Sequence, residues 1–192
     1  MVSIEKLKEK LNEIKLSNKL LRQINSKIEL DKLLNLFDKE ISKLGVYDGY
    51  YIALADEKKT NLVLEKIKFS ENFEAMVNVL EGQLIPLEPN DINSICYKEI
   101  KEIHVDDLES CYLGEFALKR FKLWKITNCL LLPISKGKKC IGLIFFYSQN
   151  NKKFEKDFVD KAKGIINTFY DQLNNSYKYS LLLKHENEVK DI

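Results

Sequence analysis

Glycine, proline and histidine are scarce in this sequence of 192 residues, which contains seven glycines, three prolines and two histidines. The glycines are scattered, and neither the G-x-G-x-x-G pattern nor the Walker pattern of phosphate-binding loops occurs. There is no G-x-S-x-G nucleophile elbow, and one of the two histidines, His185, lies in the polar C-terminal stretch. These absences argue against a phosphate-loop enzyme and leave little material for a histidine-based catalytic triad.

The cysteines have no spacing that indicates a metal site. No pair is in a C-x-x-C arrangement, and no cysteine–histidine cluster has the spacing of zinc ligands. Cys129 and Cys140 fall in apolar segments, where a free thiol behaves as a small hydrophobic group. We expect all four cysteines to be reduced, with Cys96 and Cys111 as the alternatives for a reactive thiol.

Charge and hydropathy give no sign of nucleic acid or membrane as a partner. The 31 basic and 29 acidic residues nearly balance. No apolar run approaches the ~20 residues that a membrane span needs, and the N-terminus is charged rather than signal-like. We therefore expect a cytoplasmic protein that binds neither nucleic acid nor membrane.

Two apolar segments near the C-terminus are joined by a short polar turn. Residues 128–134 and 141–147 are almost unbroken apolar runs, and residues 135–139 between them include a glycine, which predicts an antiparallel hairpin. Both runs are too uniformly apolar for a water-exposed edge, so we expect them at the centre of a sheet. Gly142 predicts close approach of a neighbouring backbone or helix. A long helix opened by Phe154 is expected to follow.

The N-terminal segment carries a heptad-like pattern. Steps of three and four place on one helical stripe Ile4, Leu7, Leu11, Ile14, Asn18, Leu21, Asn25 and Ile28. The two asparagines either fix register and partner number as buried polar residues, or lie where the helix frays into solvent. In this register Lys10 would meet Lys15 of a parallel partner, so a multi-helix bundle is favoured over an isolated zipper.

A second amphipathic stripe lies in the C-terminal helix. It comprises Ala162, Ile166, Phe169, Leu173, Ser176, Ser180 and Leu183. Because serine weakens this stripe, we expect the terminal helices to pair with those of a second subunit in a four-helix homodimer. The predicted dimer contacts are Ile4, Leu7, Leu11, Ile14, Asn18, Leu21, Ile166, Phe169 and Leu173. The chain then divides into a helix (1–27), a central domain (28–175) and the end of the exit helix with a polar tail (176–192).

Between the terminal helices the pattern alternates between strands and short helices. A helix is expected to restart within residues 26–31 and to end at Gly45. Asn90 or Asp91 is the predicted N-cap of a short helix. The other expected elements are strands over 50–55, 62–69 and 101–105, an extended segment at 83–87, and helices over 73–80 and 114–123.

The order of these elements and three short motifs resemble a GAF domain, the small sensory module of bacterial signalling proteins, over residues 28–175. The motifs are Leu131-Leu-Pro-Ile134, Ile141-Gly-Leu143 and Phe154. They are similar to the family's apolar strand ending in proline, its Ile-Gly-Val-type strand and its phenylalanine before an acidic helix start. The resemblance implies an α+β fold, with an antiparallel sheet of five or six strands and with long N- and C-terminal helices packed on one face.

The resemblance also implies a ligand pocket on the other face, covered by residues 70–126. Its candidate residues are Tyr97, His104, Cys111, Tyr112, Arg120 and Trp124. Each has a plainer interpretation. His104 can alternate outward to solvent, Trp124 can be a core residue, and Arg120 can belong to a solvated helix face.

The departures from the family's sequence patterns argue against several of its known ligands. The Asn-Lys…Phe…Asp-Glu pattern of cyclic-nucleotide-binding members is missing, and Cys111 is followed by Tyr112 where bilin-binding members have histidine. The cysteines do not resemble the trio of the methionine sulfoxide reductase members. The sequence therefore identifies no cofactor.

Two functions remain. The first is a sensory or regulatory module that binds an unidentified small molecule and relays the signal through dimeric terminal helices. The second is a structural dimerisation module without a ligand, and an enzyme ranks third. The output is expected from a further domain or from a partner protein in trans.

Overall fold

The computed structural model describes residues 30–69, 80–106 and 115–188. The N-terminal stripe, with the predicted dimer contacts Ile4, Leu7, Leu11, Ile14, Asn18 and Leu21, lies outside the described residues. The pocket candidates Cys111 and Tyr112 and nearly all of the helix expected at 73–80 also lie outside them.

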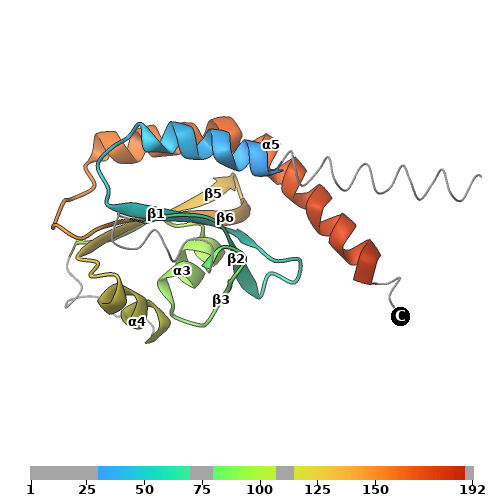
Figure 1. Cartoon of the computed structure of the whole chain (residues 1–192), viewed down its shortest axis with the longest axis horizontal. Coiled ribbons are helices and arrows are strands. Elements are labelled where there is room, and N and C mark those ends of the chain that lie inside the picture. Colours follow the sequence, from blue (N-terminus) through green and yellow to red (C-terminus); the bar gives the residue numbers. More distant parts are fainter. Residues whose placement is uncertain (1–29, 70–79, 107–114, 189–192) are drawn as a thin grey trace, which may run out of the picture. The chain divides into compact units, whose positions relative to one another are not determined.

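Six strands form one antiparallel sheet in the order β3-β2-β1-β6-β5-β4 (Figure 1). The strands are β1 (Gly49–Ala55), β2 (Asn61–Lys68), β3 (Leu84–Pro86), β4 (Ile103–Val105), β5 (Asn128–Lys136) and β6 (Lys139–Ser148). The described helices are one over residues 30–42, α3 (Ile92–Glu99), α4 (Glu115–Leu123) and α5 (Lys156–Glu188). The predicted α+β class and antiparallel sheet are confirmed.

The predicted hairpin is β5 and β6, and both strands are internal. β6 pairs with β1 and β5, and β5 pairs with β6 and β4. The turn is tighter than expected, because Lys136 already pairs with Lys139. Gly137 has φ +61°, and a two-residue turn needs a positive φ that glycine adopts without strain.

Gly142 of β6 lies directly against the backbone of β1. It pairs with Leu54. A Cβ atom added to Gly142 would collide with the carbonyl oxygen of Ala53 and lie 2.8 Å from the Cα of Leu54. The predicted close approach of a neighbouring backbone is confirmed.

Helices cover both faces of the sheet within residues 36–171. In Figure 1, α3 and α4 lie below the sheet and the first half of α5 lies above it. Alternate residues of β1 follow this division, since Tyr51 and Ala53 belong to the buried cluster beneath the sheet. On the upper face the rings of Phe146 and Phe158 meet edge to face at 5.1 Å.

The end of the first described helix and the start of α5 can be compared with the predicted boundaries. Gly45 has φ +69° and follows the helix that ends at residue 42, which confirms the predicted stop. α5 begins at Lys156 rather than at Phe154, so that prediction was two residues early. Phe154 is buried ahead of the helix, with its ring 5.3 Å from that of Phe158. An apolar residue in this position packs against the first turns and fixes how the chain enters the helix.

α4 ends in a left-handed residue that is not glycine. Lys125 has φ +51° and is exposed, and the Ile126 N–H donates to the Phe121 carbonyl at 2.9 Å. Lys125→Gly should raise the free energy of unfolding by roughly 0.5–1 kcal/mol, because glycine removes the Cβ strain but costs some backbone entropy. Urea unfolding measures this change. Lys122→Gly, one turn earlier in the helix, is the control and should lower stability by about 1 kcal/mol.

The chain forms two compact units. Residues 36–171 make up one, and the residues before and after them make up the other. In the second unit Leu30, Leu34, Leu173 and Tyr177 are buried. α5 is one continuous helix whose residues belong to both units. Among the described helices, none is long and apolar enough to span a bilayer.

Candidate functional site

Two predicted pocket residues belong to the core beneath the sheet but lie near different ends of β6, Tyr97 near Cys140 and Trp124 near Tyr147. Tyr97 of α3 and Trp124, just after α4, are 7% and 4% exposed and share one buried cluster. The rings of Trp124 and Phe69 pack edge to face, with their centroids 4.7 Å apart. Burial raises the pKa of Tyr97 to about 12, so its hydroxyl is protonated at neutral pH. Contact of either residue with a ligand stays a prediction.

The other predicted residues are not brought into this cluster by the described part of the chain. His104 is exposed on the outer strand β4, with Nε2 3.2 Å from Oε1 of Glu102. This placement agrees with the plainer interpretation of His104 as an outward-facing residue. Arg120 belongs to α4, but its side chain is outside the description, as are Cys111 and Tyr112.

A group of buried polar side chains lies at the N-terminus of α3. Asp91, Asn93 and Ser94 are 2%, 0% and 3% exposed. Oδ1 of Asp91 accepts hydrogen bonds from the Asn93 backbone N–H at 2.8 Å and from Asn93 Nδ2 at 2.7 Å. Tyr51 Oη donates to Oδ1 of Asn93 at 2.7 Å. We call these four residues the α3 polar group.

The local sequence explains how the group is held. Asp91 is the N-cap of α3, with extended backbone angles and a side chain that accepts from the first turn, as N-caps do. Tyr51 projects from β1 and stacks on Phe145 of β6, with the ring centroids 4.7 Å apart and nearly parallel. Its ring is therefore fixed by the sheet while its hydroxyl reaches the helix.

Two oxygen atoms of the α3 polar group have no hydrogen-bond partner among the described residues. They are Oδ2 of Asp91 and Oγ of Ser94, and both are inaccessible to solvent. Leaving such an atom unpaired in the interior costs about 1–3 kcal/mol, and more for a charged group.

The sequence pointed to Asp91 only as a helix cap and did not identify Asn93, Ser94 or Tyr51. The one available signal was the first turn of α3, where two small uncharged polar residues stand between Ile92 and Ile95. That signal is weak, because polar residues after an N-cap are ordinarily solvated.

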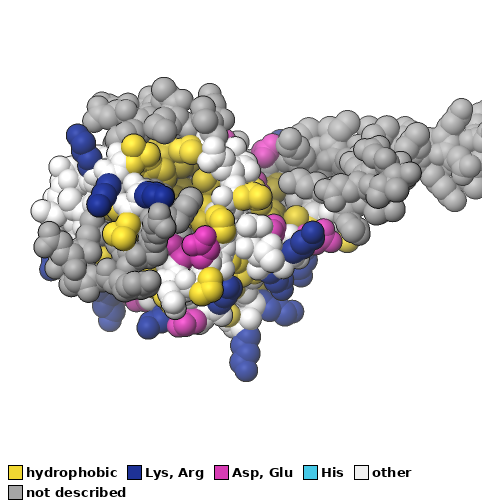
Figure 2. All heavy atoms as spheres, turned by 90° about the horizontal axis from the view of Figure 1, so that it is seen from below, with side chains coloured by type: hydrophobic (Ala, Val, Ile, Leu, Met, Phe, Trp, Pro, Cys, Tyr) yellow, Lys and Arg dark blue, Asp and Glu magenta, His cyan; other side chains and the backbone are white. Residues whose placement is uncertain are grey.

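The face that carries α3 and α4 also exposes apolar side chains, several of which are visible in Figure 2. Leu123 and Leu118 of α4 are 59% and 39% exposed. Single exposed leucines are common on protein surfaces and do not by themselves define a site.

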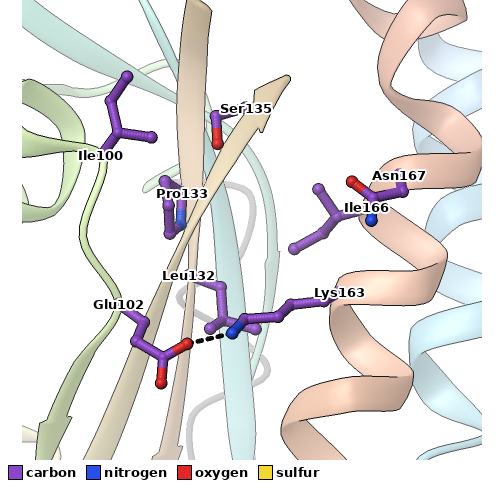
Figure 3. Close-up of a pocket in the computed structure, with 8 residues that line it drawn as sticks. All are labelled: Ile100, Glu102, Leu132, Pro133, Ser135, Lys163, Ile166 and Asn167. Atoms are coloured by element: carbon purple, nitrogen blue, oxygen red, sulfur yellow. Dashed lines mark ion pairs between the residues drawn. The ribbon is translucent and has the colours of Figure 1, made fainter. Parts of the chain in front are cut away.

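A hollow of about 240 Å³ lies on the opposite face, between β5 and α5 (Figure 3). It is lined by Ile100, Glu102, Leu132, Pro133, Ser135, Lys163, Ile166 and Asn167. β4 pairs with β5 only as far as Leu131, so it does not extend alongside the rest of β5. Pro133 lies in this stretch, where a residue without an N–H is tolerated.

An ion pair crosses the rim of the hollow. Figure 3 shows Lys163 extending from α5 toward Glu102, with which it forms an ion pair. The hydrogen bond from Lys163 lowers the pKa of the Glu102 carboxyl, and the bond with His104 adds to this effect. Because the folded-state pKa is lowered, the stabilisation is present above the unfolded-state pKa and is lost as the pH falls through the folded-state value.

Lys163→Met should therefore raise the pKa of Glu102 toward its ordinary value, because it removes the main group that favours the carboxylate. His104→Gln should raise the pKa by a smaller amount. Carboxyl carbon shifts of Glu102 followed by NMR across an acid titration measure both changes. An unaltered Glu102 titration in Lys163→Met would mean that the two side chains are not paired in solution.

Three of the four cysteines lie in the described residues. Cys96, Cys129 and Cys140 are free, and burial raises the pKa of Cys96 and raises that of Cys140 to about 11. Neither is a thiolate at neutral pH. Over the described ranges, no group of three histidine, cysteine or acidic side chains is arranged to hold a metal ion.

No protein-family model and no curated protein matches the chain. Solved structures do resemble it. A GAF domain/HD domain protein from Geobacter sulfurreducens has a TM-score of 0.63 and 12% identity, over 77% of this chain and 94% of that one. The GAF domain of a two-component sensor histidine kinase from Bacillus halodurans has a TM-score of 0.62 and 13% identity, over 78% and 96%.

A far-red cyanobacteriochrome photoreceptor is similar to the same extent. Its TM-score is 0.62 with 15% identity, and the match covers 87% of this chain and 98% of the photoreceptor chain. The likeness thus spans nearly the whole of several GAF structures and agrees with the strand order and helix placement described above. The chain has the fold of a GAF domain.

Proposed function

We propose that this chain is a sensory or regulatory GAF-type domain, which binds a small molecule beneath the sheet and transmits binding through α5. The chain's similarity to the domains of a sensor histidine kinase and of a photoreceptor supports the sensory class. No catalysis is proposed, because the pKa values of Cys96 and Cys140 are raised and neither is a ready nucleophile.

The continuity of α5 is the observation that carries the proposal. Its first half packs on the sheet through Phe158 and Ile166, and the same helix continues past Asp171 into the second compact unit. We expect a shift of its first half to be passed to residues 172–188 of the same continuous helix. A ligand produces such a shift only if it binds one helix position more tightly than another.

The predicted homodimer forms part of this proposal. Of its predicted contacts, Ile166 and Leu173 are buried and Phe169 is half-buried within the single chain. We also propose that the protein acts in the cytoplasm. The output would come from a further domain or from a partner protein in trans.

A structural module without a ligand is the second candidate. The stacked Tyr51 and Phe145 and the buried Trp124 favour it, because they fill the core beneath the sheet with the protein's own side chains.

Binding and helix response are measured separately. Native mass spectrometry of the purified protein detects a retained small molecule, and emission from Trp124, the only tryptophan, reports binding beneath the sheet. Hydrogen exchange of residues 172–188 reports the response of α5. We expect a ligand to change both signals. A Trp124→Phe variant controls for fluorescence from the compound itself. Binding that leaves α5 exchange unchanged, or no binding from a broad metabolite set, would favour the structural module.

A further inference from the structure

The α3 polar group contains an incomplete hydrogen-bonding arrangement in an apolar core. One oxygen of the Asp91 carboxyl group is paired with Asn93. Within the described part of the chain, neither Oδ2 of Asp91 nor Oγ of Ser94 has a hydrogen-bond partner. Asp91 is the N-cap of α3 and Ser94 is the third residue of the helix. The side chains at these two positions lie close together at a helix start.

A hydrogen-bond donor with positive charge would complement the Asp91 carboxylate best. Asp91 is only 2% exposed. No described lysine, arginine or histidine forms an ion pair with it. In residues 30–69, 80–106 and 115–188, the donors to its carboxyl group are the two neutral nitrogen groups of Asn93. A buried carboxylate is tolerated when a cation or several donors compensate it, so a cationic donor gains more here than a neutral one.

The surroundings define the rest of the bound molecule. Ile92 and Cys96 of α3 belong to the same apolar cluster as the stacked pair Tyr51 and Phe145. A molecule whose charged nitrogen reaches Asp91 therefore presents its remaining atoms to apolar and aromatic side chains. Anionic ligands are disfavoured, because Asp91 would repel them.

We propose that Asp91 and Ser94 bind the nitrogen of a small organic amine with an apolar body, in which the ammonium group donates to Asp91 Oδ2 and Ser94 Oγ. This inference rests on the proposed function and names the chemical class of its ligand. Asn93 acts as a positioning residue, since its two N–H groups hold the first oxygen of Asp91 and leave the second for the amine. Tyr51 supports it indirectly, by donating to Oδ1 of Asn93.

The test compares phenethylamine and isoamylamine with their neutral counterparts, phenethyl alcohol and isoamyl alcohol, on the full chain. We expect the amines to raise the melting temperature by several degrees and to change Trp124 emission, while the alcohols have little effect. Asp91→Asn should weaken amine binding at least about tenfold, because it replaces a charge-assisted bond. Without amine this variant should be no less stable than wild type, because it buries no charge and its new Nδ2 group can donate to Ser94 Oγ.

Ser94→Ala provides a second variant in case Asp91→Asn does not fold. It removes a buried hydroxyl that has no partner, so it should keep or raise stability without amine and should weaken amine binding several-fold. A response to the alcohols equal to that of the amines, or full amine binding by Asp91→Asn, would overturn the proposal. So would a high-resolution crystal structure, grown with phenethylamine, in which an ordered water alone bridges the two oxygens.

These outcomes are separable from a failure of the proposed function. If another class of compound changes Trp124 emission and α5 exchange while the amines do neither, the sensory function stands and the amine site is wrong. If no compound changes either signal, both proposals fail.

Discussion

Gly142→Ala is expected to lower the free energy of unfolding by about 2–4 kcal/mol, as overpacking against a rigid neighbour does. The added methyl group would meet the Ala53 carbonyl and the backbone of Leu54, which cannot rotate away as a flexible side chain can. β6 and β1 would have to separate at the centre of the sheet. Gly142→Val should be at least as damaging. Urea unfolding with an unchanged m-value measures the loss.

Gly164→Ala is the matched control for this substitution. Gly164 lies in α5, and an added Cβ meets nothing within 4 Å. The same chemical change should therefore raise stability by roughly 0.5–1 kcal/mol, because alanine has the better helix propensity. Equal effects at the two positions would mean that β1 and β6 do not approach as closely as described.

Asp48→Ala should lower the free energy of unfolding by about 2–4 kcal/mol, the loss expected for several bonds to one charged acceptor. Oδ2 of Asp48 accepts from Ser148 Oγ at 3.1 Å and from the Gln149 N–H at 2.7 Å. Oγ of Ser148 in turn accepts from the N–H of Lys152 at 3.2 Å. Removing the carboxylate leaves the fully buried Ser148 and the chain before α5 without this support.

Asp171→Ala tests whether any lost acid would have the same effect. Asp171 forms a 2.6 Å ion pair with Lys136, but the two side chains are 65% and 63% exposed. Such a pair is worth less than about 1 kcal/mol, since water and salt screen it. If both aspartate variants lost equal stability, the contacts of Asp48 would not be the cause.

Most elements of this fold could be predicted from the sequence, because the patterns that indicate them are local. Two apolar runs around a glycine turn predicted the central hairpin, and the glycine within the second run predicted the close approach at Gly142. Gly45 predicted a helix stop, and Asp91 was one of two predicted caps. Each inference needed only a few neighbouring residues.

The contacts between distant residues were not predictable in this way. Asp48 and Ser148 are 100 positions apart, and Glu102 meets a lysine that lies on the exit helix. The residues next to Asp48 or Glu102 in the sequence do not indicate which distant residue each will contact. The α3 polar group was missed for a related reason, because Asn93 and Ser94 have side chains that are usually solvated and the sequence alone gives no measure of their burial.

The pairing of β1 with β6 has a consequence for folding during synthesis. Gly49 pairs with Tyr147, so the two halves of the sheet are joined by residues almost one hundred positions apart. At about 5–20 residues per second, the ribosome finishes β6 roughly 5–20 s after β1. During that interval β1, β2 and β3 can form a partial sheet, but the edge of β1 that later pairs with β6 stays open. The growing chain is therefore most exposed to misassociation just before its last strand emerges.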